Sequence, residues 1–149
     1  MSLEVEVVGL KDLVSDFKRA GGDATRLVQA AVLNSTSRTQ HNIRTQAPHR
    51  TGALQQRVLM SVTATTGIVH ADEKYAEYVE YGTKPHIITP KNKKALYWKG
   101  AFSPVKLVHH PGTKANPFFR RGVDQSKAYI KEQFDKVMDR ILKELAGRA

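Results

Sequence analysis

The strongest constraint on the fold is a stripe of apolar residues near the C-terminus. The stripe recurs at intervals of four, three, four and four residues: Ile130, Phe134, Val137, Ile141 and Leu145. Met138 and Leu142 widen it, whereas charged residues such as Lys131 and Asp135 fall outside it. This period predicts a long amphipathic helix, starting at about Pro117 or Val123 and ending at Ala146. The apolar side of such a helix has to be covered by the rest of the chain.

The remaining pattern predicts a mixture of helices and short strands. Alternating residues predict a strand over 3–7, and helical spacing predicts a helix over 10–20 that ends at Gly21 and Gly22. Asp23 then suits the N-cap of a long helix from Ala24 to about Gln46. Residues 57–64 and 67–71 predict a hairpin, and residues 74–81 predict a short helix that ends at Gly82.

Short strand-like runs follow at 86–88, 95–98 and 105–109, with Lys91 to Lys94 as a hairpin tip. We therefore expect one α+β domain over residues 1–149. It should contain a small antiparallel sheet, a long N-terminal helix and a long C-terminal amphipathic helix packed on the sheet. Residues 84–114, which are basic and rich in loop-forming residues, form an insert in this domain.

The second half of the first long helix is almost entirely polar. Residues 34–42 offer little to bury, yet no glycine or proline interrupts them before Pro48. A helix of this kind is only marginally stable by itself and needs neighbours along its polar side. Partner subunits or water would both serve. We therefore treat this polar half as a candidate interface.

Positive charge is concentrated in two stretches. The chain has a net charge of +10, with no acidic residue from Ala24 to Ala71 or from Tyr81 to Val123. Such a surface attracts polyanions or an acidic protein, although it can also be only a solvated surface. The candidate contacts to DNA or to an acidic partner are Arg38, Arg44, Arg50, Arg57, Lys91, Lys93, Lys94 and Lys99.

The sequence argues against an enzyme, a metal protein or a membrane protein. The chain has no cysteine, its six histidines lack metal-ligand spacing, and its apolar runs are too short to span a bilayer. Glu4 and Glu6 stand where a signal peptide would need basic and apolar residues. Nucleophile-elbow and phosphate-loop motifs are missing. We expect no cofactor; a ribonuclease-like site built from His49, His86 or His110 stays open as an alternative.

Five motifs occur in an order that resembles one known family. They are G-L-x-x-L at Gly9 to Leu13, A-P-x-R-T-G-x-L at Ala47 to Leu54, and Y-A-x-Y-V-E-[FY]-G-T at Tyr75 to Thr83, followed by H-P-G-T at His110 to Thr113 and N-P-F-[FL]-R at Asn116 to Arg120. The set resembles the neck or tail-completion proteins of long-tailed double-stranded DNA bacteriophages, the gene-ten-product-like putative tail components of lambdoid siphophages. The chain departs from the family where members continue P-F-L-R-P-A, since Phe119, Arg121 and Gly122 stand there.

The resemblance implies a structural virion protein, present in the host cytoplasm during assembly. It implies a ring at the head–tail neck or the head-proximal tail end, with six copies as the first expectation and twelve as the second. Partners would be head-completion or adaptor proteins and tail terminator or tube proteins, with non-specific DNA contact in the lumen and no membrane. The alternative is a stand-alone basic nucleic-acid-binding module that uses residues 91–99. Tyr97 and Trp98, as neighbours on a strand, would then point to opposite faces.

The motifs also supply the candidate contact and anchor residues. We expect subunit contacts from Tyr75, Glu77, Tyr78, Glu80, Tyr81 and Thr83, because tyrosines are common in interfaces and the two acids would meet a basic neighbour. The alternative is a core helix that ends at a glycine. Expected turn and anchor residues are Pro48, Thr51, Gly52, Gly82, Pro117 and Phe118, with a plain surface turn and core aromatics as the alternatives.

Overall fold

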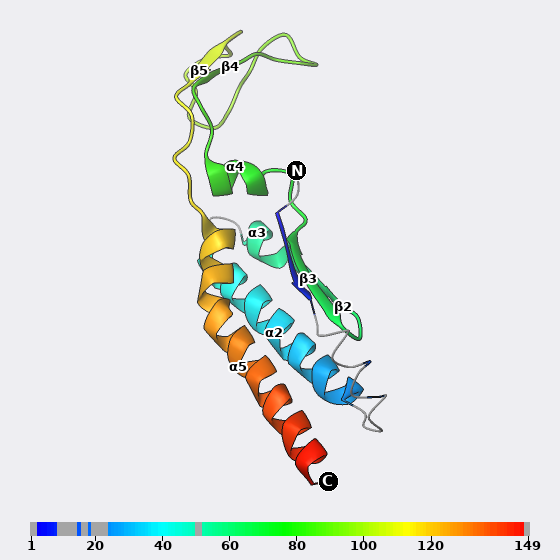
Figure 1. Cartoon of the computed structure of the whole chain (residues 1–149). Helices are drawn as coiled ribbons and strands as arrows, with labels where there is room; N and C mark the ends of the chain where they lie inside the picture. Colours follow the sequence, from blue (N-terminus) through cyan, green and yellow to red (C-terminus); the bar gives the residue numbers. More distant parts are fainter. Residues whose placement is uncertain (1–2, 9–14, 16–17, 19–23, 50–51, 148–149) are drawn as a thin grey trace.

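Two long antiparallel helices form the body of the protein. The computed structural model describes residues 3–8, 15, 18, 24–49 and 52–147. Helix α2 (Thr25–Gln46) and helix α5 (Phe118–Ala146) lie side by side along most of their length (Figure 1). Val28 and Val32 of α2 pack with Val137 and Ile141 of α5 in a buried apolar cluster. The predicted C-terminal helix is confirmed, and it begins near the earlier of its two expected starts.

A three-stranded antiparallel sheet covers one side of α2. Strand β3 (Thr66–Ala71) lies between β1 (Glu4–Val8) and β2 (Val58–Val62), and β2 and β3 form the predicted hairpin. The inward-facing residues of β3, Gly67, Val69 and Ala71, are buried. Together with the helices, this sheet confirms the expected α+β class. The helix expected over 10–20, with its glycine end and its Asp23 cap, falls almost wholly outside the described residues.

One side of the polar half of α2 is buried within the chain, whereas Asn34, Arg38 and His41 are exposed. Our expectation of an interface along this half is therefore wrong for the buried side. Ser35, Thr36 and Thr39 are fully buried, and the hydroxyls of Thr36 and Thr39 donate to backbone carbonyls one turn earlier, at 2.7 and 2.8 Å. Nδ2 of Asn42 donates to Oγ of Ser126 on α5 at 3.0 Å. The neighbours that this half requires are therefore α5 and β3.

Gly122 makes this close packing possible. A Cβ placed at this glycine would lie 2.5 Å from Cα of Ile43 in α2. The backbones of the two helices are thus in contact at this point. The buried hydroxyl of Thr36 faces the sheet instead, where a Cβ added at Gly67 of β3 would overlap its Oγ1. Gly122 is also where the chain departs from the family motif, so the departure coincides with the α2–α5 contact.

The segment between α2 and β2 turns sharply. Helix α2 ends at Ala47, whose extended backbone precedes Pro48. Gly52 has a left-handed backbone with φ of 73°, and it begins a short helix, α3 (Ala53–Gln56), that the sequence did not predict. Leu54 of this helix is buried in the core. Arg50 and Thr51, expected respectively as a DNA contact and as part of the turn, lie outside the described residues.

A hairpin arm extends beyond the body (Figure 1). We define the arm as residues 84–114; it follows the short helix α4 (Ala76–Tyr81) and precedes α5. Strands β4 (His86–Ile88) and β5 (Val108–His110) pair within it, and a single bridge joins Leu96 to Val105. The expected tip at 91–94 is wrong, because the chain turns back only after Trp98, where Ala101 N–H donates to Trp98 O at 3.0 Å.

We predict that Gly122→Ala lowers the free energy of unfolding by about 1–3 kcal/mol, because the added methyl group has to push α2 away from α5. Alanine would otherwise favour a helix over glycine by up to about 1 kcal/mol, so a loss isolates the steric effect. Urea denaturation measures both variants. Gly147→Ala at the end of α5 is the matched control, since its Cβ would meet only Lys143 O at 3.4 Å. Equal stability of the two variants would contradict the close contact.

Candidate functional site

The arm and the body meet at a junction built around the buried carboxylate of Glu80. This side chain on α4 is 4% exposed, and its two oxygens accept the backbone N–H groups of Phe119 at 2.9 Å and Arg120 at 3.1 Å. The first N–H groups of a helix have no carbonyl partner within it, and the helix start carries partial positive charge. Glu80 therefore caps α5 from 39 residues away. Our expectation that Glu80 contacts a neighbouring subunit is wrong.

Both chain segments that connect to the arm are tied together at the junction. Thr83 and Thr113 exchange two backbone hydrogen bonds, at 2.9 and 3.0 Å, and Asn116 N–H donates to Val79 O at 2.8 Å. Gly82 ends α4 with φ of 72°, and a Cβ there would lie 2.5 Å from Thr113 O. Beside these bonds, Phe118 at the start of α5 is fully buried, and Pro117, just before it, is half-buried. The arm is thus anchored on both sides.

Helix α4 presents three tyrosines to the outside. Tyr75, Tyr78 and Tyr81 are 40%, 62% and 72% exposed, which contradicts the alternative in which they belong to the core. Glu77 and Thr83 are half-buried beside them. Exposed tyrosines combine a large apolar area with a polar tip, which suits them to a protein interface. The subunit-contact expectation for these five residues stays a prediction.

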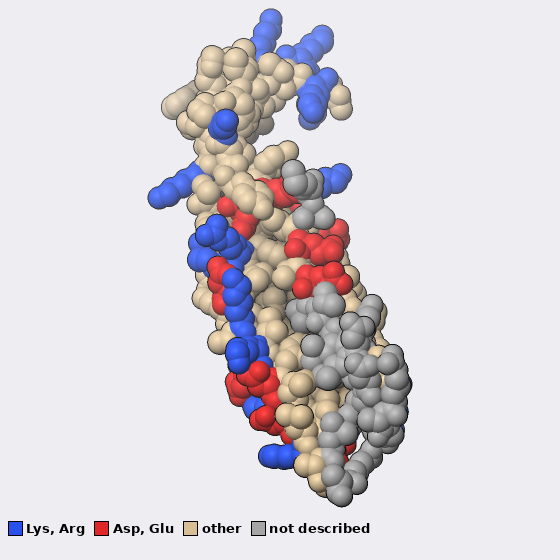
Figure 2. Space-filling view, in the orientation of Figure 1, with Lys and Arg blue, Asp and Glu red and all other residues tan. Residues whose placement is uncertain are grey.

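The arm is a basic surface with exposed apolar side chains. Figure 2 shows basic side chains over the arm, all of them lysines in the sequence, and no acidic side chain there. Its exposed large apolar residues are Ile87, Ile88, Tyr97, Trp98, Phe102 and Leu107, and its lysines Lys91, Lys93, Lys94 and Lys99 are exposed as well. Between β4 and β5 the rings of His86 and His110 stack with centroids 5.0 Å apart. Tyr97 and Trp98 lie outside any strand, so the expected opposition of their side chains does not apply.

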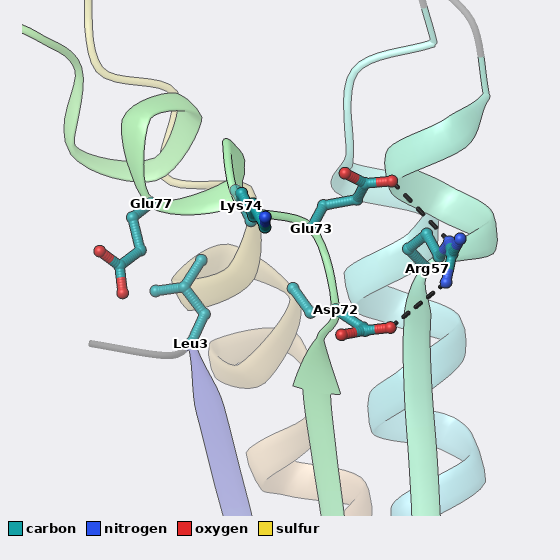
Figure 3. Close-up of a pocket in the computed structure, with 8 residues that line it drawn as sticks. Leu3, Arg57, Asp72, Glu73, Lys74 and Glu77 are labelled. Carbon is teal, nitrogen blue, oxygen red and sulfur yellow. Dashed lines mark hydrogen bonds and ion pairs between the residues drawn. The ribbon is translucent and has the colours of Figure 1, made fainter.

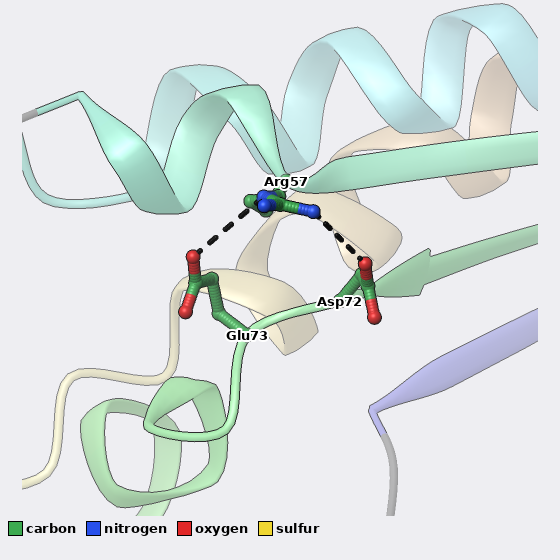
Figure 4. A network of polar contacts seen from close by, with 3 residues as sticks. All are labelled: Arg57, Asp72 and Glu73. Atoms are coloured by element: carbon green, nitrogen blue, oxygen red, sulfur yellow. Dashed lines mark hydrogen bonds and ion pairs between the residues drawn. The ribbon is translucent and has the colours of Figure 1, made fainter.

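Two of the expected DNA-contacting arginines bind within the chain. The guanidinium of Arg44 donates twice to Val58 O, at 3.1 and 2.9 Å, which ties α2 to β2. Arg57 forms ion pairs with Asp72 at 3.3 Å and with Glu73 at 3.8 Å (Figure 4). These contacts hold Arg44 to the sheet, whereas the Arg57 side chain stays 57% exposed beside its two carboxylates. The expected DNA contact of both arginines stays a prediction. Arg38 is exposed, with its guanidinium 4.8 Å above the ring of Tyr129.

Lysines on α5 also have carboxylate partners within the chain. Lys127 lies 2.6 Å from Asp124 and its hydrogen bond lowers the pKa of that carboxyl. The two other pairs show the matching effect on the lysine: the hydrogen bond to Asp135 raises the pKa of Lys131, and the hydrogen bond to Glu132 raises the pKa of Lys136. The arm, by contrast, contains no acid at all. Among the described lysines, those of the arm therefore form the cluster that is available to an outside anion.

A pocket of about 510 Å³ opens between the end of the sheet and α4 (Figure 3). Leu3, Ala71 and Ala76 give it apolar surface, and its charged lining residues are Arg57, Asp72, Glu73, Lys74 and Glu77. No histidine lines it. His49 lies beside Gln55 of α3, whereas His86 and His110 stack on the arm, so the ribonuclease-like alternative gains no assembled site.

Comparisons with known proteins give no family: no family model, no curated protein and no solved structure matches the chain. Within the described residues, no group of three or more histidine or acidic side chains could hold a metal ion. No described helix is both long enough and apolar enough to cross a membrane. The arm, its junction and the neighbouring pocket are therefore the features on which a function can be argued.

The sequence predicted a subunit contact for Glu80, whereas the structure shows it as the cap of α5. The start of α5 has two arginines and no acid in its first turn, so its partial positive charge lacks a local partner. That absence is the one signal in the sequence that an acid from elsewhere has to serve as the cap. The sequence does not say which of the chain's fourteen acids takes that role.

We predict that Glu80→Ala destabilises the protein by about 1–3 kcal/mol, because the Phe119 and Arg120 N–H groups lose their acceptor in a largely buried site. Glu80→Gln should lose less, since its carbonyl oxygen can still accept one N–H. Urea denaturation measures the change, and amide hydrogen exchange at Phe119 and Arg120 should accelerate. Asp139→Ala, an exposed acid on α5, is the control. Unchanged exchange at both amides in Glu80→Ala would contradict the capping role.

Proposed function

We propose that this chain is a structural component of the neck or the head-proximal tail end of a tailed bacteriophage or prophage. Copies of the chain would form a ring that completes the tail and joins it to the head. Six copies are the first expectation, and twelve are the second. Three of the five motif segments behind the resemblance meet at the junction of α4, the arm and α5. These are residues 75–83, 110–113 and 116–120, joined through Glu80, Thr83 and Asn116.

The observation that carries the proposal is the anchored arm with its exposed apolar side chains. A single soluble domain rarely leaves several large apolar side chains together in water, so a surface of this kind is typical of an interaction site. Because the arm is tied at both connections, it can reach a neighbouring component in a defined direction. A joining protein requires contacts of this type with its own copies and with the components above and below.

The charge distribution fits the same role. The arm's lysines would face DNA in the lumen of the ring or an acidic surface on a partner. Contacts to DNA would go to phosphates, so they would be independent of sequence and sensitive to salt. The expected partners are head-completion or adaptor proteins and tail terminator or tube proteins. The proposed role involves neither catalysis nor a cofactor.

Electron microscopy of a phage lysate tests the proposal. We predict that an early stop codon in this gene yields separate filled heads and tails, or tails of irregular length, because the joint between them is incomplete. Supplying the intact gene in the host should restore joined particles, which controls for effects on neighbouring genes. Intact infectious particles from the stop-codon phage would overturn the proposed role.

The exposure of both Tyr97 and Trp98 among lysines favours the second candidate, a stand-alone nucleic-acid-binding module. Fluorescence anisotropy with a short DNA, measured over a range of salt concentrations, tests it. We predict that changing Lys91, Lys93 and Lys94 to Gln weakens binding about tenfold or more at low salt, since each lost phosphate contact also reduces the salt dependence. The matched control changes Lys127, Lys131 and Lys136 on α5 to Gln. An equal loss of DNA affinity in both variants would show that binding depends only on the net charge of the protein, which would contradict a binding module on the arm.

A further inference from the structure

The arm carries more apolar surface than its own fold can cover. Its two strands are three residues each, and an isolated two-stranded hairpin is marginally stable in water. Phe102 is fully exposed, and Tyr97 is 68% exposed. These aromatic side chains are placed where only another molecule can cover them. The exposed apolar surface of the arm is therefore suited to bind another molecule.

One side of the body carries acidic side chains. Figure 2 shows them grouped on the side of the sheet, below the level of α4. Glu4 and Glu6 are exposed on β1, opposite His70 and Ile68 of β3, and no described base lies within ion-pair distance of either. The arm has seven lysines and no acid, whereas the rest of the chain has a net charge of +3. The complementarity is therefore local: the arm matches this acidic side of the body, a condition that favours association between two copies.

The pocket beside α4 offers a place for an aromatic ring. Its volume of about 510 Å³ is lined by Leu3, Ala71 and Ala76, and by three acidic and two basic residues, Asp72, Glu73, Glu77, Arg57 and Lys74. Arg57 pairs with Asp72 and Glu73, so the lining keeps one net negative charge, which a lysine of the arm would balance. An aromatic side chain buries about 150–250 Å² when it is covered. An ammonium group next to that ring would lie against the carboxylates. The arm of the same copy points away from this pocket, so its own tip does not fill it (Figure 1).

We propose that the arm of one copy docks on the acidic side of the next, with Phe102 in the pocket and Lys99 against Asp72 and Glu73. The contact joins two different surfaces, so each copy both gives an arm and receives one. Contacts of this kind close into rings when the rotation between copies allows it. This inference rests on the proposed function, for which it supplies the contact between copies.

Disulfide trapping tests this contact without background, because the chain has no cysteine. One copy carries Ser103→Cys, which keeps the neighbouring Phe102 ring, and a second, differently tagged copy carries Lys74→Cys at the edge of the pocket. Mild oxidation of the mixture should give a mixed dimer at about tenfold or more the yield of Ser103→Cys with Lys127→Cys, since docking holds the two thiols at high effective concentration. Both body positions are exposed lysines, which makes the control a matched one.

Charge reversal provides a second measurement that does not depend on oxidation. Lys99→Glu should weaken self-association in sedimentation at low salt, and adding Asp72→Lys to the same chain should restore it. Three outcomes would each overturn the inference: equal trapping at Lys74 and Lys127, dimers formed mainly between two copies of Ser103→Cys, or a chain that stays monomeric. Rings that form without the disulfide between Ser103→Cys and Lys74→Cys would overturn this contact and leave the neck role intact. The neck role itself is decided by the stop-codon lysate.

Discussion

The capping of α5 by Glu80 is the interaction on which the rest of the structure depends. A buried carboxylate is costly unless hydrogen bonds replace its water, and two backbone N–H groups at the positive end of a helix do so here. The bond fixes where α5 begins, and with it the register in which α5 meets α2. It also fixes the two chain segments that leave for the arm. One side chain thereby couples the α2–α5 core to the surface that we propose makes the contacts.

The close approach of α2 and α5 complements this cap. Gly122 brings the backbones of α2 and α5 into contact at Ile43, and on the sheet side of α2 Gly67 leaves room for the buried side chain of Thr36. A body of this kind resists bending because its layers interlock over much of the length of α2. The arm is the opposite case, since its strands are short and much of its apolar surface is open. A rigid body that carries an arm with exposed apolar side chains suits a protein whose arm is covered by a binding partner.

Periodicity was enough to predict the α+β class, both long helices, the β2–β3 hairpin and α4. It failed where packing depends on small or polar residues. The polar half of α2 looked like a free surface because hydrophobic patterning cannot anticipate that Gly67 in a strand leaves room for the side chain of Thr36. The sequence suggested that Glu80, Arg44 and Arg57 bind another molecule, because the groups that they bind within the chain are distant in the sequence. Arg44, for example, binds a carbonyl of β2, a contact that only the folded chain creates.

The claim that most needs testing is that the Glu80 junction holds the arm in one direction. Spin labels at Ile87→Cys on the arm and Lys127→Cys on α5 report the distance between them by pulsed electron paramagnetic resonance, in a chain free of other cysteines. The measurement is made on labelled copies diluted with unlabelled protein. We predict a single narrow distance distribution that broadens strongly when Glu80→Ala is added. A broad distribution in the chain with Glu80 intact, or an unchanged width in the variant, would contradict the account.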